Sequence, residues 1–223
     1  MLEAMFEKFD SIVVLDVETT GIDYRVDEII ELAALRLDAV GSVDDELDVF
    51  IRLSDGRTLP PEIVRLTGIT GQMLEQDGVT KSAACGEFLR FLDRPRTLIV
   101  AYNAQFDLCF LYRFLLKQGK AEALKGVKML DALTVYKDRR AYPHKLSDAV
   151  AAYSLKTQNT HRAIDDTKAT LELLFEMEKE QGDLEKYINL FGYNPRYGVS
   201  GQKISSVTYV EQGYNETRRL YEK

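Results

Sequence analysis

Two carboxylates stand two residues apart near the start of the chain, at the end of an apolar run. Residues 11–15 are Ser-Ile-Val-Val-Leu, and Asp16, Val17 and Glu18 follow them before a Thr-Thr-Gly turn. A run this short, rich in β-branched residues and closed by turn residues, predicts a strand. Because side chains alternate across a strand, Asp16 and Glu18 should share one face where the strand emerges. Both faces are apolar before that point, which is typical of a central strand covered on both sides.

A carboxylate pair of this kind has the chemistry of a metal site. Two carboxylates held together repel each other, and each raises the pKa of the other unless a cation lies between them. Carboxylate oxygens are ligands that suit Mg²⁺ or Mn²⁺. The alternative interpretation is a strand that ends in a polar turn, and residues 11–21 by themselves favour neither interpretation.

Two further segments place acids at the ends of predicted elements. Residues 101–107, Ala-Tyr-Asn-Ala-Gln-Phe-Asp, follow a strand and put Asp107 in the first turns of a helix. Residues 161–167, His-Arg-Ala-Ile-Asp-Asp-Thr, open the last long helix. Each segment has a structural alternative, since Asp107 complements a helix dipole and Asp165 or Asp166 can cap a helix. The conjunction of all three segments is much harder to obtain by chance.

The elements that must position these acids follow from hydrophobic periodicity. Residues 28–37 and 46–53 flank Gly41-Ser42 and predict a hairpin, although residues 28–37 also have helical character. Three antiparallel strands, followed by helices that alternate with two more strands, predict an α/β fold with a mixed sheet and helices on both faces. The remaining strands are expected at 97–101 and 127–131, and helices at 62–66, 82–92, 103–119, 145–153 and 163–179.

Composition bounds the class of protein. A chain of 223 residues with 45% hydrophobic and 29% charged residues fits one medium domain of a globular protein, with or without an appendage. The two cysteines, Cys85 and Cys109, lie in helical patterns and predict buried thiols in a reducing compartment. Residues 1–10 carry scattered charges and no apolar core segment, and no apolar run reaches membrane-spanning length. We therefore expect a cytoplasmic protein without a membrane partner.

The net charge limits the kind of nucleic-acid binding. A formal charge of −7 and a pI near 5.1 argue against broad, charge-driven binding to duplex nucleic acid. They do not exclude an enzyme that holds a few nucleotides at a chain end, because bound metal ions there offset carboxylates and phosphates together.

The three motifs together resemble a known family. Asp-x-Glu-Thr-Thr-Gly at 16–21, Asn-x-x-Phe-Asp at 103–107 and His-x-x-x-x-Asp at 161–166 resemble the exonuclease motifs of the DnaQ-like superfamily, and the histidine indicates its DEDDh subgroup. That subgroup includes the epsilon subunit and the PolC-type exonuclease domain of bacterial DNA polymerase III, and several stand-alone DNA and RNA exonucleases. The resemblance covers roughly residues 11–178 and implies a ribonuclease H-like fold, in agreement with the order of elements. One departure is Tyr102, where many relatives have histidine.

The resemblance implies roles for five residues. Asp16, Glu18, Asp107 and Asp166 would hold two Mg²⁺ or Mn²⁺ ions about 4 Å apart, which activate water and hold the leaving oxygen. His161 would be the general base, since an imidazole with a pKa of about 6.5 accepts a proton at neutral pH.

The resemblance also implies contacts to the terminal nucleotide. The turn after the first strand should lie against it, where a glycine permits close approach and Ile22 packs on a base. The expected substrate-binding residues are Thr19, Thr20, Gly21, Ile22, Asn103 and Phe106.

One local basic cluster stands outside these motifs. Its members could guide an incoming strand, and the alternative is a solvated loop. The cluster consists of Lys137, Arg139, Arg140 and Lys145, interleaved with Tyr136 and Tyr142.

We expect an exonuclease domain over residues 1–182 and a C-terminal extension over residues 183–223. The pair Leu190-Phe191 resembles the end of peptides that dock on sliding clamps, but the dense tyrosines and branched residues around it favour packing on the core.

The function predicted from these observations is a metal-dependent 3′→5′ exonuclease that releases nucleoside 5′-monophosphates from single-stranded DNA during proofreading or repair. One alternative is a stand-alone exoribonuclease that trims RNA 3′ ends. Another is a silent nucleic-acid-binding module, against which the presence of all five motif residues argues. The expected partners are a single-stranded 3′ end and a DNA polymerase subunit or sliding clamp.

Overall fold

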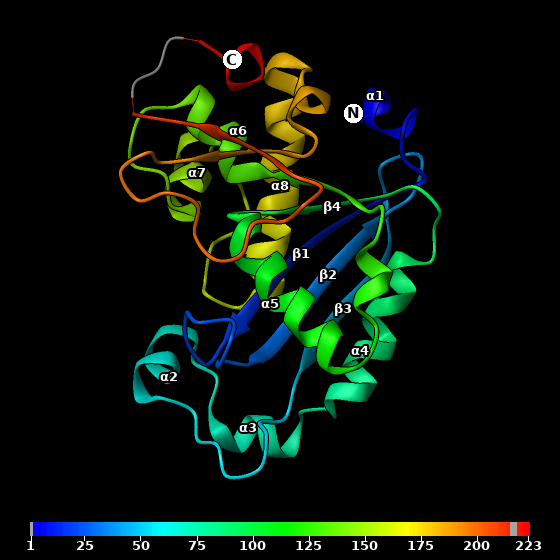
Figure 1. Ribbon diagram of the computed structural model, residues 1–223, viewed down its shortest axis with the longest axis vertical. Coiled ribbons are helices and arrows are strands. Elements are labelled where there is room, and N and C mark those ends of the chain that lie inside the picture. The colour runs from blue at the N-terminus through cyan, green and yellow to red at the C-terminus, as the bar shows by residue number, and fades with distance from the viewer. Residues whose placement is uncertain (1, 215–217) are drawn as a thin grey trace.

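The computed structural model describes residues 2–214 and 218–223 and is built around one mixed five-stranded sheet (Figure 1). The strand order is β3-β2-β1-β4-β5. Strand β2 is antiparallel to both β1 and β3, whereas β4 is parallel to both β1 and β5. This confirms the predicted α/β fold with three antiparallel strands followed by parallel ones. The strands are β1 (Ser11–Thr19), β2 (Ile29–Leu37), β3 (Val43–Phe50), β4 (Thr97–Ala101) and β5 (Lys128–Asp131).

Helices cover both faces of the sheet, as the alternation within β1 predicts (Figure 1). Ile12 and Val14 belong to the hydrophobic cluster on the face of α6, α7 and α8, whereas Val13 and Leu15 belong to the cluster on the face of α4 and α5. All four side chains are fully buried, so β1 is the central strand. These helices are α4 (Lys81–Leu89), α5 (Ala104–Lys117), α6 (Ala132–Arg139), α7 (Leu146–Ala152) and α8 (Ala163–Gln181).

Three short helices were not predicted by periodicity, because four to eight residues are too few to show it. They are α1 (Glu3–Phe6), α3 (Gly71–Gln76) and α6; α2 (Pro61–Thr67) matches the predicted helix at 62–66. Leu2 and Met5, which precede the first strand, are buried in the main core.

Strand β3 begins three residues earlier than predicted. The turn before it is closed by a hydrogen bond from the Asp38 amide to the Ser42 carbonyl, 2.9 Å long, so pairing starts at once. The acidic residues that follow lack an apolar pattern, but Arg36 on β2 binds Asp44 at 2.9 Å and Asp45 at 3.5 Å. Ion pairs between the two strands therefore extend the hairpin over residues in which hydrophobic periodicity predicts no strand.

The C-terminal segment packs on α6 and α8 rather than extending into solvent. Tyr187, Phe191 and Leu220 are buried in it. Because Phe191 is only 2% exposed, the pair Leu190-Phe191 is not free to dock on a partner. The segment contains η3 (Leu184–Tyr187), β6 (Leu190–Tyr193), the parallel strand β7 (Thr208–Glu211) and η4 (Leu220–Glu222).

Two members of the predicted basic cluster, Arg139 and Arg140, are paired with acids of the protein. The Arg139 side chain is fully buried and binds Asp183 and Glu180, and Arg140 binds Glu180 at 2.8 Å. The sequence pattern did not reveal these acids because they lie forty or more residues further along the chain.

Both cysteines are free and buried, as predicted. Within residues 2–214 and 218–223, the helices include none with the length and hydropathy needed to cross a membrane.

Candidate active site

The parallel strands β1, β4 and β5 end at the same edge of the sheet, and the predicted acids gather there. Asp16 and Glu18 lie on the α8 side of β1, both partly buried. Glu18 faces Glu31 across the β1–β2 ladder. The carboxyl edge of parallel strands is the usual place for a ligand site in α/β folds.

Asp107 approaches β1 from α5. It is 2% exposed, and its Oδ1 accepts a hydrogen bond of 3.2 Å from the Val17 amide, so its carboxylate lies against the backbone between Asp16 and Glu18. The start of α5 is capped by Asp131, whose Oδ1 accepts from the Ala104 amide at 3.0 Å. Because another acid caps the helix, Asp107 is left free to face the site.

Asp166 and His161 complete the group from the start of α8. One potential ligand atom each from Glu18, His161 and Asp166 lie within 4.8 Å of one another. Asp166 is held by Asn159, whose Nδ2 donates to Oδ2 at 2.5 Å, and by the Thr160 amide, which donates to Oδ1 at 3.1 Å. These donors point the Asp166 carboxylate toward Glu18 instead of toward the helix amides.

The start of α8 is capped by Glu31, from a neighbouring strand. Its Oε2 accepts from the Ala163 amide at 2.9 Å, and its Oε1 accepts from Nε and Nη2 of Arg162 at 2.9 and 2.7 Å. Glu31 is fully buried, so this bidentate pair anchors the residue after His161 to the sheet. His161 itself has a left-handed φ of +59° and an exposed side chain. No side chain of Asp165 or Asp166 caps the helix, so the capping alternative is not what the structure shows.

The electrostatics of the site favour a cation. Burial, followed by the charges of neighbouring carboxylates, raises the pKa of Glu18 to about 8 and that of Asp16 well above its usual range. Burial likewise raises the pKa of Asp107 to about 8 and raises the pKa of Asp166. Arg162 opposes the shift at Glu18, but within the described ranges no salt bridge reaches these four acids. Converging carboxylates with raised pKa values are the donor set that a divalent cation fits.

The predicted substrate residues lie around this group. The Thr19 hydroxyl donates to the Gly21 carbonyl at 2.6 Å, and the Thr20 hydroxyl donates to Asp27 at 3.0 Å. A Cβ on Gly21 would lie 2.5 Å from the Asp27 carboxylate, so a larger residue would push that carboxylate away from the Thr20 hydroxyl. The turn presents Ile22, which is 89% exposed.

From the other side come two residues of the 103–107 motif. Asn103 is exposed and has a left-handed φ of +66° at the start of α5, and Phe106 is half-buried beside Phe110, with ring centroids 4.8 Å apart. Tyr102 is buried and donates to the His144 carbonyl at 2.8 Å, so it supports the loop before α7.

Sequence reasoning missed Glu31, Arg162 and Asn159. One signal was available for Glu31, because a lone acid inside the apolar run of β2 must have a partner when buried. No local signal identifies Asn159.

A protein-family model described as "Exonuclease" matches residues 13–174, about three quarters of the chain. The chain belongs to the exonuclease family. Among the relatives of this chain, the PolC-type DNA polymerase III of Bacillus subtilis is 35% identical over 181 residues, which cover 78% of this chain and 12% of that protein. The corresponding polymerase of Halalkalibacterium halodurans is 36% identical over 184 residues, covering 80% of this chain and 12% of that protein. The chain thus spans about an eighth of the length of these relatives.

Solved structures of exonuclease I share the fold. Escherichia coli exonuclease I in complex with a dT13 oligonucleotide gives a TM-score of 0.72 at 22% identity, over 80% of this chain and 43% of that one. A zinc-bound complex of the same enzyme with single-stranded DNA gives a TM-score of 0.73 at 22% identity, over 80% and 42% of the chains. The ribonuclease H-like fold and the resemblance to the DnaQ-like superfamily are both confirmed.

Proposed function

We propose that this exonuclease removes nucleoside 5′-monophosphates from the 3′ end of single-stranded DNA with the help of two divalent metal ions, Mg²⁺ or Mn²⁺. The observation that carries the proposal is the convergence of four carboxylates and His161 at one sheet edge, where no salt bridge within residues 2–214 and 218–223 reaches the acids. The PolC-type relatives, which are DNA polymerases, and the exonuclease I complexes with DNA oligonucleotides support DNA as the substrate.

The carboxylates would hold the metal ions. Asp16, Glu18 and Asp166 are the proposed ligands of the first ion, with Asp16 shared and Asp107 supporting the second. Divalent ions held by these carboxylates would offset the negative charge of the phosphate and lower the pKa of bound water. Asn159 and the Thr160 amide keep Asp166 oriented for this role.

His161 is the proposed general base. Its imidazole is exposed and lies within 4.8 Å of carboxylate oxygens of Glu18 and Asp166, where it can take a proton from the attacking water. The ion pair of Arg162 with Glu31 holds the backbone next to it, so the ring is presented from a fixed point.

The terminal nucleotide would lie between the turn after β1 and the start of α5. Ile22 offers an exposed apolar surface for a base, and Phe106 offers an aromatic face from the opposite side. The backbone at Thr20 and Gly21 would contact the 3′ end. Because its relatives are PolC-type DNA polymerases, we propose that this chain acts together with a DNA polymerase.

The test is hydrolysis of matched oligonucleotides. Single-stranded DNA and RNA of the same sequence, each labelled at the 5′ or at the 3′ end, are incubated with Mg²⁺, Mn²⁺ or excess EDTA. We expect mononucleotides released from the 3′ end of DNA only when a divalent ion is present. Faster hydrolysis of RNA would favour the exoribonuclease alternative, and binding without hydrolysis would favour the silent module. Full turnover in EDTA would contradict the metal-dependent mechanism.

A further inference from the structure

The first turn of α5 carries two groups of the proposed reaction. Phe106 is a proposed contact of the terminal base, and Asp107 is a proposed ligand of the second metal ion. The amide at the start of this helix belongs to Ala104 and donates to Asp131, the last residue of β5, at 3.0 Å. Because a site is only as precise as the elements that carry it, the placement of Phe106 and Asp107 depends on how the start of α5 is held.

One set of hydrogen bonds joins Asp131 to the C-terminal segment through Thr134 on α6. The Thr134 hydroxyl donates to Asp131 at 2.6 Å and accepts from the Gly192 amide on β6 at 2.9 Å. The Thr134 carbonyl accepts from the Gln212 side chain at 2.9 Å. A Cβ on Gly192 would lie 2.1 Å from the Gln212 amide oxygen, so a glycine at 192 lets both residues reach Thr134. Thr134 is fully buried, so water cannot replace these partners.

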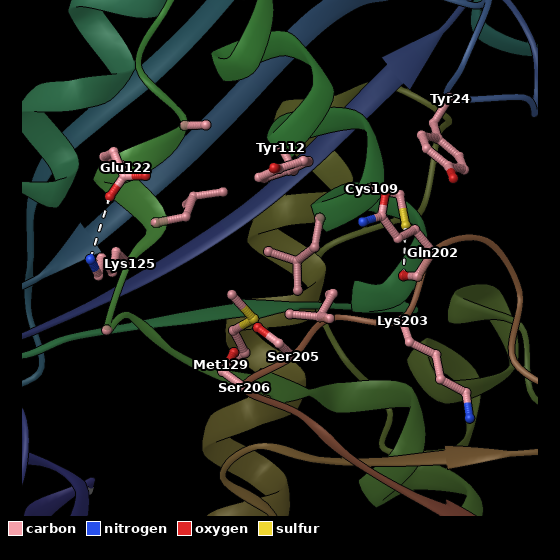
Figure 2. Close-up of a pocket in the computed structure, with 15 residues that line it drawn as sticks. Tyr24, Cys109, Tyr112, Glu122, Lys125, Met129, Gln202, Lys203, Ser205 and Ser206 are labelled. Carbon is pink, nitrogen blue, oxygen red and sulfur yellow. Dashed lines mark hydrogen bonds and ion pairs between the residues drawn. The ribbon is translucent and has the colours of Figure 1, made fainter.

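A second set of hydrogen bonds holds the same helix at Gln105, next to Phe106. The Gln105 amide nitrogen donates to the Gln202 carbonyl at 2.8 Å, and its amide oxygen accepts from the Tyr209 hydroxyl at 2.7 Å. One turn later the Cys109 thiol donates to the same Gln202 carbonyl at 3.6 Å (Figure 2). The C-terminal segment therefore fixes α5 through side chains before and after Phe106.

These contacts fall at the active-site end of α5. One turn beyond Cys109, Tyr112 borders a cavity of about 380 Å³ that lies behind α5, between that helix, η2 (Ala121–Leu124) and residues 202–206 (Figure 2). At Tyr112 this cavity separates the helix from the segment, whereas at Gln105 and Cys109 the two are in direct contact. The segment thus holds the part of the helix that carries the proposed ligand and base contact.

The C-terminal segment lies beyond residues 13–174, which match the exonuclease family model. Its contacts with Thr134 and Gln105 therefore come from outside the part of the chain that carries all the proposed metal ligands.

We propose that the C-terminal segment is part of the active-site framework, because it positions the start of α5. Thr134 acts on Asp107 through Asp131. Gln105 acts on Phe106, so Thr134 and Gln105 are both positioning residues of the proposed reaction. The inference rests on the proposed function and assigns each set of contacts its own effect, the first on metal binding and turnover and the second on binding of DNA.

The first set is tested with Thr134→Val, which removes the hydroxyl and keeps a side chain of similar shape. Affinity for Mn²⁺ is measured by calorimetry without DNA, and kcat and KM are measured on single-stranded DNA in Mg²⁺. We expect Mn²⁺ affinity and kcat to fall about tenfold with KM for DNA unchanged, because partners behind a metal ligand have effects of this size. Thr134→Ser keeps the hydroxyl and should restore both values. Gln212→Met, in the segment itself, should lower both by about threefold, since one neutral hydrogen bond is lost.

The second set is tested with Tyr209→Phe, which removes one hydroxyl from a half-buried ring. KM for single-stranded DNA should rise about threefold, the size expected for one lost hydrogen bond, while kcat and Mn²⁺ affinity stay unchanged. Tyr193→Phe is the matched control on the neighbouring strand, because its hydroxyl binds Glu211 at the surface, 3.3 Å away. It should leave all three values unchanged.

A further control separates positioning from stability. Tyr187 is fully buried in the same segment, and its hydroxyl donates to Asp138 at the far end of α6, 2.8 Å away. Tyr187→Phe should lower the melting temperature at least as much as Tyr209→Phe does, yet keep the wild-type Mn²⁺ affinity, kcat and KM.

Wild-type Mn²⁺ affinity and kcat in folded Thr134→Val and Gln212→Met would overturn the inference, as would a wild-type KM in Tyr209→Phe. Equal losses in Tyr187→Phe would overturn it as well, because general loosening of the segment would then explain them. A wild-type chain that cleaves no single-stranded oligonucleotide would instead refute the proposed function, and the Mn²⁺ affinities would still decide the first set of contacts. The two failures are therefore distinguishable.

Discussion

The candidate active site and the junction between α6 and the C-terminal segment both gather buried carboxylates, but only the junction supplies cations for them. At the junction, the fully buried Arg139 side chain binds Asp183 and Glu180. The hydroxyls of Tyr187 and Tyr221 add donors to Asp138 and Asp183, each at 2.8 Å. Burial of ions is tolerated there because the opposite charges pair with each other and tyrosine hydroxyls donate to the carboxylates.

At the candidate active site the carboxylates are buried as well, but no salt bridge among the described residues offsets their charge. Burial raises the pKa of Glu18 and that of Asp107 to about 8, and burial followed by neighbouring carboxylates raises the pKa of Asp16 well above its usual range. The paired acid nearby, Glu31, is committed to Arg162 and to the start of α8. Unlike the acids of the junction, these acids do not stabilise the fold when they are charged. Carboxylates that are buried without stabilising the fold are typical of a ligand-binding site.

The largest effect should come from removing one acid of the uncompensated set. Asp166→Asn should lower oligonucleotide hydrolysis by at least about 10³-fold, because one proposed ligand of the reacting centre is lost. In EDTA its melting temperature should stay the same or rise, since one repelling charge is gone. Asp165→Asn is the matched control, and its activity should stay close to wild type. A large drop in the melting temperature of Asp166→Asn would show that this acid is structural, like those at the junction.

The next effect concerns the base beside the acids. His161→Ala should lower kcat by about 10²- to 10⁴-fold, and the acidic limb of the pH–rate profile should shift or vanish. His144→Gln, at the only other histidine, should keep that limb. An unchanged profile in His161→Ala would move the role to another group.

The junction should respond in the opposite way, through stability. Arg139→Met leaves Asp183 buried without its cation, which should cost about 3–5 kcal/mol and lower the melting temperature by roughly 10 °C. Arg140→Met removes a pair whose side chains are 33% and 28% exposed, so it should cost no more than about 1 kcal/mol. Hydrolysis by Arg139→Met, measured well below its melting temperature, should remain near wild type. Equal melting of the two variants would contradict the comparison.

The smallest effect should be a dependence of the melting temperature of the metal-free protein on pH. Glu18 and Asp107 have pKa values near 8 when folded, far above those of an unfolded chain, so the folded protein holds more protons between about pH 5 and 8. Stability should therefore fall as pH rises through that window. In EDTA the melting temperature should be several degrees lower at pH 8 than at pH 6.

Saturating Mg²⁺ should reduce or reverse the difference in melting temperature between pH 6 and pH 8, because the metal binds the deprotonated acids. The matched variant Asp16→Asn should show a shallower pH slope in EDTA. A melting temperature that rises from pH 6 to pH 8 without metal would contradict the assigned electrostatics.

The sequence by itself determined the order of the main elements, and it predicted the acids and the histidine that the fold brings together. The alternation along β1 predicted which side chains face α8 and which face α5, because a two-residue period is a local property of the chain. The three motifs each lie within a few residues of an element end, so their acids could be assigned to one sheet edge from the carboxyl ends of β1 and β4.

The tertiary structure alone decided which charges are balanced. Arg139 looked like part of a basic surface, yet it is buried against Asp183, forty-four residues away. Glu31 and Arg162 are 131 residues apart and meet only because α8 crosses β2. The partner of a buried charge is set by long-range packing, which leaves no local period in the sequence. For the same reason the cavity behind α5 could not be predicted, since its walls come from α5, η2 and residues 202–206.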